Sequence, residues 1–577
     1  MTALGMFARP FLRPHDTSKT LPGSASGSGR ASDRYRSRVF LAMAVFVLVY
    51  GAICGRLITL GLGDPRQTVS HAQLIEDVTK ARPDIIDRNG TLLASDILVP
   101  SLYAEPHKIL DVDLAVEDLL TVLPDLDADE LRRRLSSGRR FAWVQRELSS
   151  RERAHVHALG IPGLHFINET RRVYPAGGLA AHVLGHVDID NRGIAGIERY
   201  IDATGLADLH AFGFARGEDL PERRLTIDLR VQHALRDELA TAMETFSAKA
   251  AGGVIIDART GEVVALVSLP DYDPALPEGS LDPEAINRIT TGVYELGSAI
   301  KAFTVAMALD AGVATLETRY DARSPIRIAS FTIDDFHAQR RILTVPEVFV
   351  HSSNIGTARM ALDVGIEGHQ SFLERLGFKD SLPTELPESS SPLFPSNWGE
   401  LSSMTISFGH GFSISPMQAV AAGAALVNGG RLLQPTFLER SEDEARSLST
   451  QVLKPETSDM MRYLMRLNAE EGTARRADLG GFRIGGKTGT AEKVVDGRYS
   501  NDKILATFLA AFPMEDPRYV MLTMLDEPKG IPETHGYRTS GWNIVPATGR
   551  VIERIAPLLG VSRGETSDVS GLVRAEL

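Results

Sequence analysis

Residues Tyr294 to Phe303 read YELGSAIKAF, which places a serine and a lysine three positions apart at the start of an apolar run. Two interpretations fit this stretch. In the first, Ser298 caps an ordinary helix and Lys301 is a solvated charge on its first turn. In the second, Ser298 is a nucleophile and Lys301 is its base. Because short motifs recur by chance, the choice between them depends on the rest of the chain.

The second interpretation has physical requirements that this stretch can meet. On a helix that begins at Gly297, Ser298 and Lys301 share a face, so the lysine amine would lie beside the serine hydroxyl. A neutral amine can accept the hydroxyl proton, provided that burial or a nearby cation lowers the pKa of Lys301. The backbone N–H groups at the helix start would stabilise an oxyanion.

A second Ser-x-x-Lys, from Ser500 to Lys503, provides an internal comparison. It lies in the polar segment DGRYSNDK, which links two predicted strands. Because Asn501 and Asp502 favour a turn, we do not expect this serine and lysine to share a face. We therefore assign no chemistry to Ser500.

Two further motifs follow Ser298 along the chain. The stretch HSSNIG (residues 351–356) contains the chain's single Ser-x-Asn, from Ser352 to Asn354. The stretch GGKTGT (residues 485–490) contains its single Lys-Thr-Gly, on a predicted strand. Each is weak by itself, but the order Ser-x-x-Lys, Ser-x-Asn, Lys-Thr-Gly resembles the triple motif of penicillin-binding proteins and serine β-lactamases.

That resemblance implies a role for each motif residue. Ser298 would be the acylated nucleophile and Lys301 its general base, Ser352 would relay protons, and Asn354 would hold a substrate amide. The N–H groups of Ser298 and Thr490 would form the oxyanion hole. The strand that binds a terminal carboxylate would consist of Lys487, Thr488, Gly489 and Thr490. Lys487 would also lower the pKa of the base and attract the anionic end of the substrate.

Composition excludes several other functions. The formal net charge of −12 argues against nucleic-acid binding, which requires a basic face. Cys54 is the only cysteine, so the chain forms no internal disulfide and no cysteine-based metal site.

His182 and His186 have the spacing of two zinc ligands, but Val183 replaces the glutamate of the metalloprotease motif and no third ligand is evident. We expect neither a metal nor an organic cofactor, and we interpret His410 as a loop residue near the site.

The N-terminal end predicts a membrane anchor. Residues 1–36 are rich in Ser, Gly, Pro and Arg and predict a disordered tail. Residues 37–62 hold a long uncharged run that can span a bilayer, longer than a cleaved signal would need. Seven basic residues against two acidic ones precede Val39, which predicts a cytoplasmic N-terminus and an extracytoplasmic remainder.

Local patterns predict several elements beyond the anchor. We expect a tight turn at residues 87–90, a charged helix within 125–140, and a strand leading into a helix at 223–235. A hairpin should turn at residues 257–261, and three strands should follow near residues 482–490, 504–512 and 519–525. Strands at both ends with helices between them predict one antiparallel sheet that helices cover.

Further segments resemble the class B penicillin-binding proteins, and particularly their septal cell-division type. They are residues 82–94, 171–185, 193–202, 225–228, 257–274 and 409–418. Leu296 departs from the family, many of whose members have proline there. The resemblance implies a multidomain α+β chain: an anchor at 37–62, an elongated pedestal (dimerisation-type) domain at 63–232, a serine β-lactamase-like transpeptidase domain at 233–562, and a polar tail at 563–577.

The same resemblance implies a D,D-transpeptidase that cross-links peptidoglycan stem peptides ending in D-Ala-D-Ala and that β-lactams inhibit. It implies the bacterial inner membrane and the division septum as location, and a membrane glycosyltransferase of the SEDS family and other divisome proteins as partners. An elongation-type enzyme stays an alternative, as does, with less support, a β-lactam sensor. Residues 63–232 lack the Glu-Asp-x-x-Phe run of a class A glycosyltransferase, and no Glu-x-x-Leu-Asn of a β-lactamase follows Asn354.

Overall fold

The structure, a computed structural model, describes residues 43, 46–51, 53, 82–206, 221–328, 331–479, 481–495 and 497–564. The predicted tail at 1–36 and almost all of the predicted polar end at 563–577 lie outside these residues. The chain divides into two compact units, Met1–Asp77 and Val78–Leu577. The two are described separately.

The first unit contains the predicted anchor, of which eight residues are described. These residues are helical, and their large apolar side chains are exposed, as at Phe46 and Leu48. Within the described parts of the chain, no helix has the length and apolar character that crossing a membrane requires.

The second unit begins with a mixed sheet in the pedestal. Its strands are β1 (Ile85–Ile86), β2 (Leu92–Ala104), β3 (Ala142–Gln145), β4 (Leu164–Val173) and β5 (Arg223–Arg224). The long strand β2 pairs antiparallel with β1, β3 and β4, whereas β1 pairs parallel with β5. The predicted turn between β1 and β2 is confirmed: the Asp87 carboxylate accepts from the Asn89 and Thr91 N–H groups, and Gly90 has a φ of +85°.

Three helices lie next to the C-terminal end of β2 and the N-terminal end of β4, and they share a small core. They are α3 (Val112–Val122), α4 (Ala128–Leu135) and α5 (Ser150–Ala158), and their buried residues include Leu119, Leu131 and Val156. The predicted charged helix is α4. It is shorter than the charged stretch because Asp127 caps its first turn by accepting from the Glu130 N–H at 2.7 Å.

A buried ion network joins the strands of the pedestal to helix α7 (Gly196–Ile201). Glu198, which is fully buried, accepts from Arg82 at 2.8 Å and from Arg172 at 2.7 Å. The same two arginines also pair with Asp202 and Asp96. Desolvated charges of this kind are tolerated only where each has a partner, so the network fixes α7 against β2 and β4.

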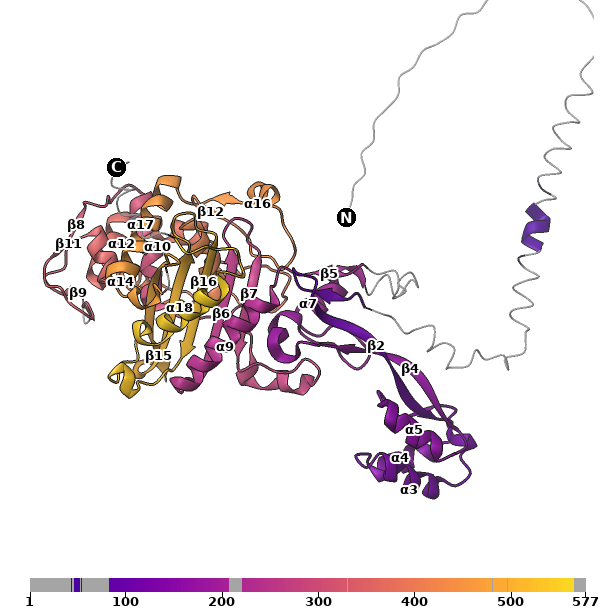
Figure 1. Ribbon diagram of the computed structural model, residues 1–577. Helices are drawn as coiled ribbons and strands as arrows, with labels where there is room; N and C mark the ends of the chain where they lie inside the picture. The colour runs from indigo at the N-terminus through magenta and orange to yellow at the C-terminus, as the bar shows by residue number, and fades with distance from the viewer. Residues whose placement is uncertain are drawn as a thin grey trace, which may run out of the picture. The chain divides into compact units, whose positions relative to one another are not determined.

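The remainder of the second unit is built on one antiparallel sheet with the strand order β14-β15-β16-β6-β7. Strands β6 (Ala250–Asp257) and β7 (Val263–Leu269) precede the helical middle of the chain, whereas β14 (Gly485–Val495), β15 (Arg498–Phe512) and β16 (Tyr519–Asp526) follow it. The prediction of one sheet from distant segments is therefore confirmed. In Figure 1, β6 and β16 lie next to each other at the centre of this sheet.

Helices cover both faces of the sheet (Figure 1). Helices α9 (Leu229–Thr245) and α18 (Ile544–Ile555) pack against one face, over a core that includes Phe508 and Phe512. On the other face, alternate strand residues such as Leu509 and Val520 join the core beneath the remaining helices. Both faces of β16, and of β15 from Ile504 onward, are buried, which explains why these sequences are apolar without alternation.

The helices of the second face and the connections are α6 (Ala181–Leu184), α10 (Lys301–Asp310), α11 (Val345–Val350), α12 (Asn354–Val364), α13 (Ile366–Arg375), α14 (Glu400–Ile406), α15 (Pro416–Ala425), α16 (Glu442–Leu448) and α17 (Pro455–Glu471). Short strands between them are β8 (Arg319–Asp321), β9 (Ile326–Ile328), β10 (Phe331–Ile333), β11 (Ile342–Thr344), β12 (Arg431–Leu432) and β13 (Thr450–Gln451).

The prediction of a turn at Asn501 and Asp502 is wrong. Both residues belong to β15, in which Ser500 pairs with Lys493 and Ile504 pairs with Glu492. Residues 501–503 are thus extra residues within a strand, where they cause an irregularity. The hairpin turns earlier, beside Gly497, whose φ of +75° suits a tight turn.

Candidate active site

Ser298 lies at the edge of the sheet, where the chain before α10 presses against β14. Its turn is a 3-10 helix, η7 (Gly297–Ile300), rather than the first turn of an α-helix. A Cβ atom on Gly297 would lie 2.7 Å from the Thr490 carbonyl oxygen, and one on Gly489 would lie 2.1 Å from the Leu296 carbonyl oxygen. Only glycine allows this approach, so these two glycines place Ser298 against the Lys-Thr-Gly strand.

Lys301 is the first residue of α10, and 1% of its surface is exposed. Its Nζ lies 3.1 Å from Ser352 Oγ and also donates to the Ser352 carbonyl oxygen. Burial lowers the pKa of Lys301 well below its ordinary value, the charge of Lys487 lowers it further, and Asp335 opposes this shift. The amine is therefore suited to be neutral, as a proton acceptor must be.

Lys487 approaches the same hydroxyl from β14. It is fully buried, and its Nζ lies 3.0 Å from Ser352 Oγ. Burial lowers the pKa of Lys487 to about 7. Ser352 itself has a φ of +56°, a strained value for a residue with a side chain. Its hydroxyl can accept from one lysine and donate to the other when that lysine is neutral, so it connects the two amines.

Asn354 begins α12. Its side chain is oriented by the loop that contains Asp334 and Asp335, which was not predicted from the sequence. The Asn354 amide donates to the Asp334 carbonyl oxygen at 2.8 Å, which leaves its own oxygen available to a ligand N–H. The Asp335 carboxylate accepts from the Ser353 hydroxyl at 2.8 Å and from the Ile355 N–H at 2.9 Å. Asp335 thereby fixes the start of the helix that carries the Ser-x-Asn motif.

The two threonines of β14 each contact a second hydroxyl behind the strand. Thr488 Oγ1 lies 2.7 Å from Thr473 Oγ1, and Thr490 Oγ1 lies 2.9 Å from Ser540 Oγ. Thr473 and Ser540 were not predicted from the sequence, because a single threonine or serine outside a motif carries no signal of such a role.

A second group of polar residues surrounds Glu295, three positions before Ser298 in the chain. Glu295 accepts from the Gly411 N–H at 3.0 Å and from the Tyr499 hydroxyl at 3.2 Å, and burial raises its pKa. His410 packs edge-on against Tyr499, and burial together with the charge of Lys301 lowers its pKa to about 4. His410 is thus neutral near pH 7, in the loop where the sequence placed it.

The remaining candidates lie elsewhere. His182 Nε2 bonds the Ala285 carbonyl oxygen at 2.8 Å, and no cluster of three potential metal ligands occurs among the residues that the structure describes.

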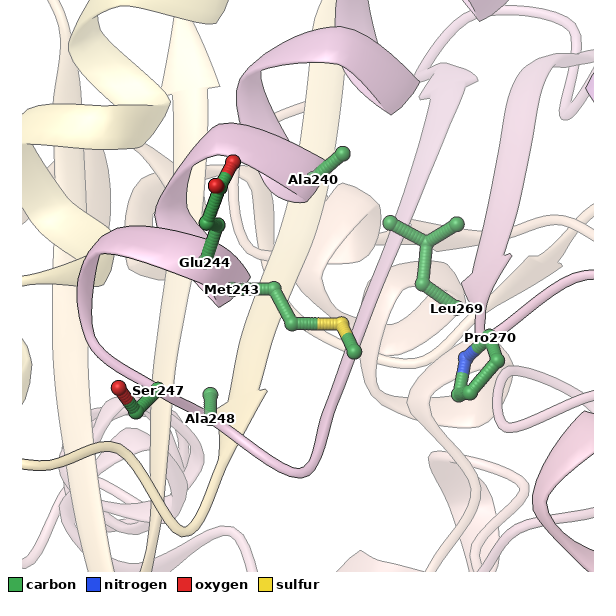
Figure 2. A pocket seen from close by; sticks show the side chains of 7 residues that line it. All are labelled: Ala240, Met243, Glu244, Ser247, Ala248, Leu269 and Pro270. Carbon is green, nitrogen blue, oxygen red and sulfur yellow. The ribbon is translucent and has the colours of Figure 1, made fainter.

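A pocket of about 460 Å³ lies between the last turn of α9, with Met243 and Glu244, and the end of β7, with Leu269 and Pro270 (Figure 2). Because β7 and β14 are opposite edges of the sheet, this pocket is separate from Ser298.

Family models account for both parts of this architecture. The model of the penicillin-binding protein transpeptidase domain matches residues 251–542, and that of the penicillin-binding protein dimerisation domain matches residues 78–204. The chain belongs to the class B penicillin-binding proteins.

Curated relatives extend the match over most of the chain. A probable peptidoglycan D,D-transpeptidase FtsI of Caulobacter vibrioides is 39% identical over 93% of this chain and 91% of its own length. A probable peptidoglycan D,D-transpeptidase PenA of Neisseria meningitidis is 32% identical over 86% of this chain and 88% of its own. The peptidoglycan D,D-transpeptidase FtsI of Escherichia coli is 28% identical over 85% of this chain and 87% of its own.

Proposed function

We propose that this protein is a peptidoglycan D,D-transpeptidase that forms cross-links through a serine acyl-enzyme during septal cell-wall synthesis. The observation that carries the proposal is the arrangement of two buried lysines around the Ser352 hydroxyl, one of them at the start of the helix that follows the Ser298 turn. The family membership and the names of the relatives support it.

In the first half of the reaction, Ser298 Oγ attacks the carbonyl carbon of the penultimate D-Ala of a donor stem peptide. Neutral Lys301 accepts the hydroxyl proton, either directly or through Ser352. The oxyanion accepts hydrogen bonds from the Ser298 and Thr490 N–H groups. The C–N bond then breaks, the proton passes through Ser352 to the departing amine, and the terminal D-Ala leaves.

In the second half, an amine of a neighbouring stem peptide attacks the ester carbonyl. The amine loses a proton to Lys301, the bond between the ester carbon and Ser298 Oγ breaks, and Ser298 recovers its proton. The products are a new amide cross-link and the free enzyme. A β-lactam undergoes the first half, but its leaving group stays attached through the opened ring, so the second half is blocked.

The strand β14 binds the substrate by its terminal carboxylate. Protonated Lys487 supplies the charge, and the Thr488 and Thr490 hydroxyls supply hydrogen bonds. Asn354, with its amide held by Asp334, accepts from an N–H of the donor stem. A bound carboxylate also favours the charged form of Lys487, and this charge keeps Lys301 neutral.

We also propose the membrane arrangement and the partner. Residues 37–62 anchor the chain with the N-terminus in the cytoplasm, and the exposed apolar side chains of helical residues 46–50 support this. The pedestal at 63–232 carries the transpeptidase domain at 233–562 outside the inner membrane. Because residues 63–232 lack the Glu-Asp-x-x-Phe run of a class A glycosyltransferase, a SEDS-family polymerase and other divisome proteins would supply and organise the glycan strands.

A reconstitution tests this function. The purified full-length chain receives lipid-linked disaccharide pentapeptide, with and without a SEDS polymerase. We expect no glycan from the chain alone, and cross-linked glycan with release of D-Ala once the polymerase is added. The Ser298→Ala variant should yield polymer without cross-links. Glycan from the chain alone, or cross-links from Ser298→Ala, would contradict the proposal.

A fluorescent fusion tests the septal role. We expect it to concentrate at midcell, whereas uniform labelling of the side wall would favour the elongation type.

A further inference from the structure

We propose that Thr473 and Ser540 are positioning residues that direct the hydroxyl groups of Thr488 and Thr490 toward the substrate carboxylate. The proposal rests on the proposed function, because it assigns the carboxylate to these threonines. Neither Thr473 nor Ser540 touches the ligand. Each acts through the threonine in front of it, from a separate segment: Thr473 follows α17, and Ser540 begins the short 3-10 helix η10 (Ser540–Trp542) before α18.

The hydrogens around Ser540 can be assigned from the contacts alone. Ser540 is 1% exposed, and its hydroxyl contacts the Gly489 carbonyl oxygen, which can only accept. Its single proton is therefore committed to Gly489. The Ser540 N–H donates to Thr490 Oγ1 at 3.2 Å, and the two hydroxyl oxygens lie 2.9 Å apart. Within this contact, the Thr490 hydroxyl is consequently the donor and Ser540 Oγ the acceptor.

This arrangement prepares Thr490 for an anion. When a carboxylate arrives, the Thr490 proton can turn from a neutral hydroxyl to a charged oxygen, which is the stronger acceptor. Throughout this change Thr490 Oγ1 still accepts from the Ser540 N–H, so the side chain keeps its position. The bond to the Gly489 carbonyl oxygen also fixes the peptide group whose N–H, that of Thr490, belongs to the proposed oxyanion hole.

Thr473 forms the equivalent support for Thr488. Asn468, fully buried, donates its amide to the Gly486 carbonyl oxygen at 2.8 Å, so its Oδ1 is an acceptor. That Oδ1 accepts from the Thr473 N–H at 3.1 Å and lies 3.3 Å from Thr473 Oγ1. The Thr473 proton can point to Asn468 in the empty site. It can turn to Thr488 Oγ1, 2.7 Å away, once Thr488 donates to a carboxylate.

The two supports share one consequence for the ligand. A carboxylate offers one charged oxygen to each threonine hydroxyl, whereas a neutral amide in its place offers a single oxygen that is a weaker acceptor. Loss of a supporting hydroxyl should therefore slow acylation by the first ligand more than by the second. A purely structural role would slow both to the same extent.

The test uses the full-length chain and a matched pair of penicillins, one with its carboxylate and one with a neutral amide at that position. Second-order acylation rate constants are measured for Thr473→Val, which removes the hydroxyl at nearly constant volume, and for Thr473→Ser, which keeps it. We expect Thr473→Val and Ser540→Ala to reduce the carboxylate-to-amide rate ratio by about tenfold, the effect of losing one hydrogen bond. Thr473→Ser should keep the wild-type ratio.

Two results would overturn the proposal. One is an unchanged rate ratio in Thr473→Val, whether neither penicillin is slowed or both are slowed equally. The other is a loss of the ratio in Thr473→Ser as large as in Thr473→Val. If Ser540→Ala fails to fold, as thermal unfolding will reveal, the Thr473 pair decides the question. Failure of the proposed function is distinguishable, because labelling would then persist in Ser298→Ala, whatever the ratio.

Discussion

Lys301 and Lys487 lie 186 positions apart in the chain, yet their amines lie 3.1 and 3.0 Å from the same Ser352 oxygen. Both side chains are buried, and burial lowers the pKa of each. In the proposed mechanism, Lys301 on α10 is a neutral base, whereas Lys487 on β14 is charged and binds the substrate carboxylate. The arrangement therefore requires their protonation states to differ during catalysis.

The first prediction concerns the pH dependence of acylation. The rate constant kcat/KM should rise with pH through the lowered pKa of Lys301, because only the neutral amine accepts the Ser298 proton. For a carboxylate ligand it should fall again above about pH 7, where Lys487 loses its charge. Stopped-flow acylation with the acid and amide penicillins checks this. Identical alkaline limbs for both ligands would remove Lys487 from carboxylate binding.

The second prediction concerns Asp335, whose charge raises the pKa of Lys301 against the effect of burial. Asp335→Asn removes that charge, so the pKa of Lys301 should fall further and the acid limb of the rate profile should move to lower pH. The amide can still accept from Ser353 or Ile355, which limits the structural change. Asp334→Asn, which leaves the neighbouring backbone contacts in place, is the control. An unmoved acid limb in Asp335→Asn would contradict the assignment.

The third prediction is a gain in stability when the base is removed. Lys301 has a lowered pKa in the folded chain, so the unfolded chain binds more protons between that pKa and about 10.4, and folding stability rises with pH across this window. Lys301→Met keeps similar volume without the proton. It should raise Tm by about 2 °C at pH 7, and the difference from wild type should shrink toward pH 10. Differential scanning calorimetry measures this, and a constant difference would argue against a neutral buried lysine.

The fourth prediction tests the close approach of Ser298 to β14. In Gly489→Ala the new methyl group would lie 2.1 Å from the Leu296 carbonyl oxygen, so the Ser298 turn must move away from the strand. We expect acylation to fall at least about 100-fold, as a displacement of about 1 Å can cause. Gly399→Ala, where a Cβ meets nothing within 4 Å, is the matched control. Normal labelling of Gly489→Ala would show that the turn tolerates displacement.

Much of this architecture is predictable from the sequence. Alternating or continuous apolar runs predicted β6, β7 and the three late strands, and Asp87 with Gly90 predicted the first turn. Ser352 and Lys487 could be proposed as site residues because the Ser-x-Asn and Lys-Thr-Gly motifs follow Ser-x-x-Lys in the order of a known family. These features depend on local periodicity or on short motifs, which a single sequence displays directly.

The supporting contacts could not be predicted, because they join residues that only the tertiary path brings together. Ser540 lies 50 positions beyond Thr490, and Asp335 lies 18 positions before Ser353. The turn that we predicted at Asn501 failed for a related reason: Ser500 and Ile504 both pair with β14, so the strand continues on each side of residues whose own preference is for turns. The 3-10 start of the Ser298 helix likewise follows from contact with β14, not from its own sequence.

The central claim is that Ser298 is the residue that becomes acylated. The most direct measurement is intact-protein mass spectrometry of the full-length chain after reaction with penicillin, followed by peptide mapping of the adduct. We expect one adduct, located on Ser298, that is absent from Ser298→Ala and present in Ser500→Ala. An adduct on another residue, or undiminished labelling of Ser298→Ala, would contradict it.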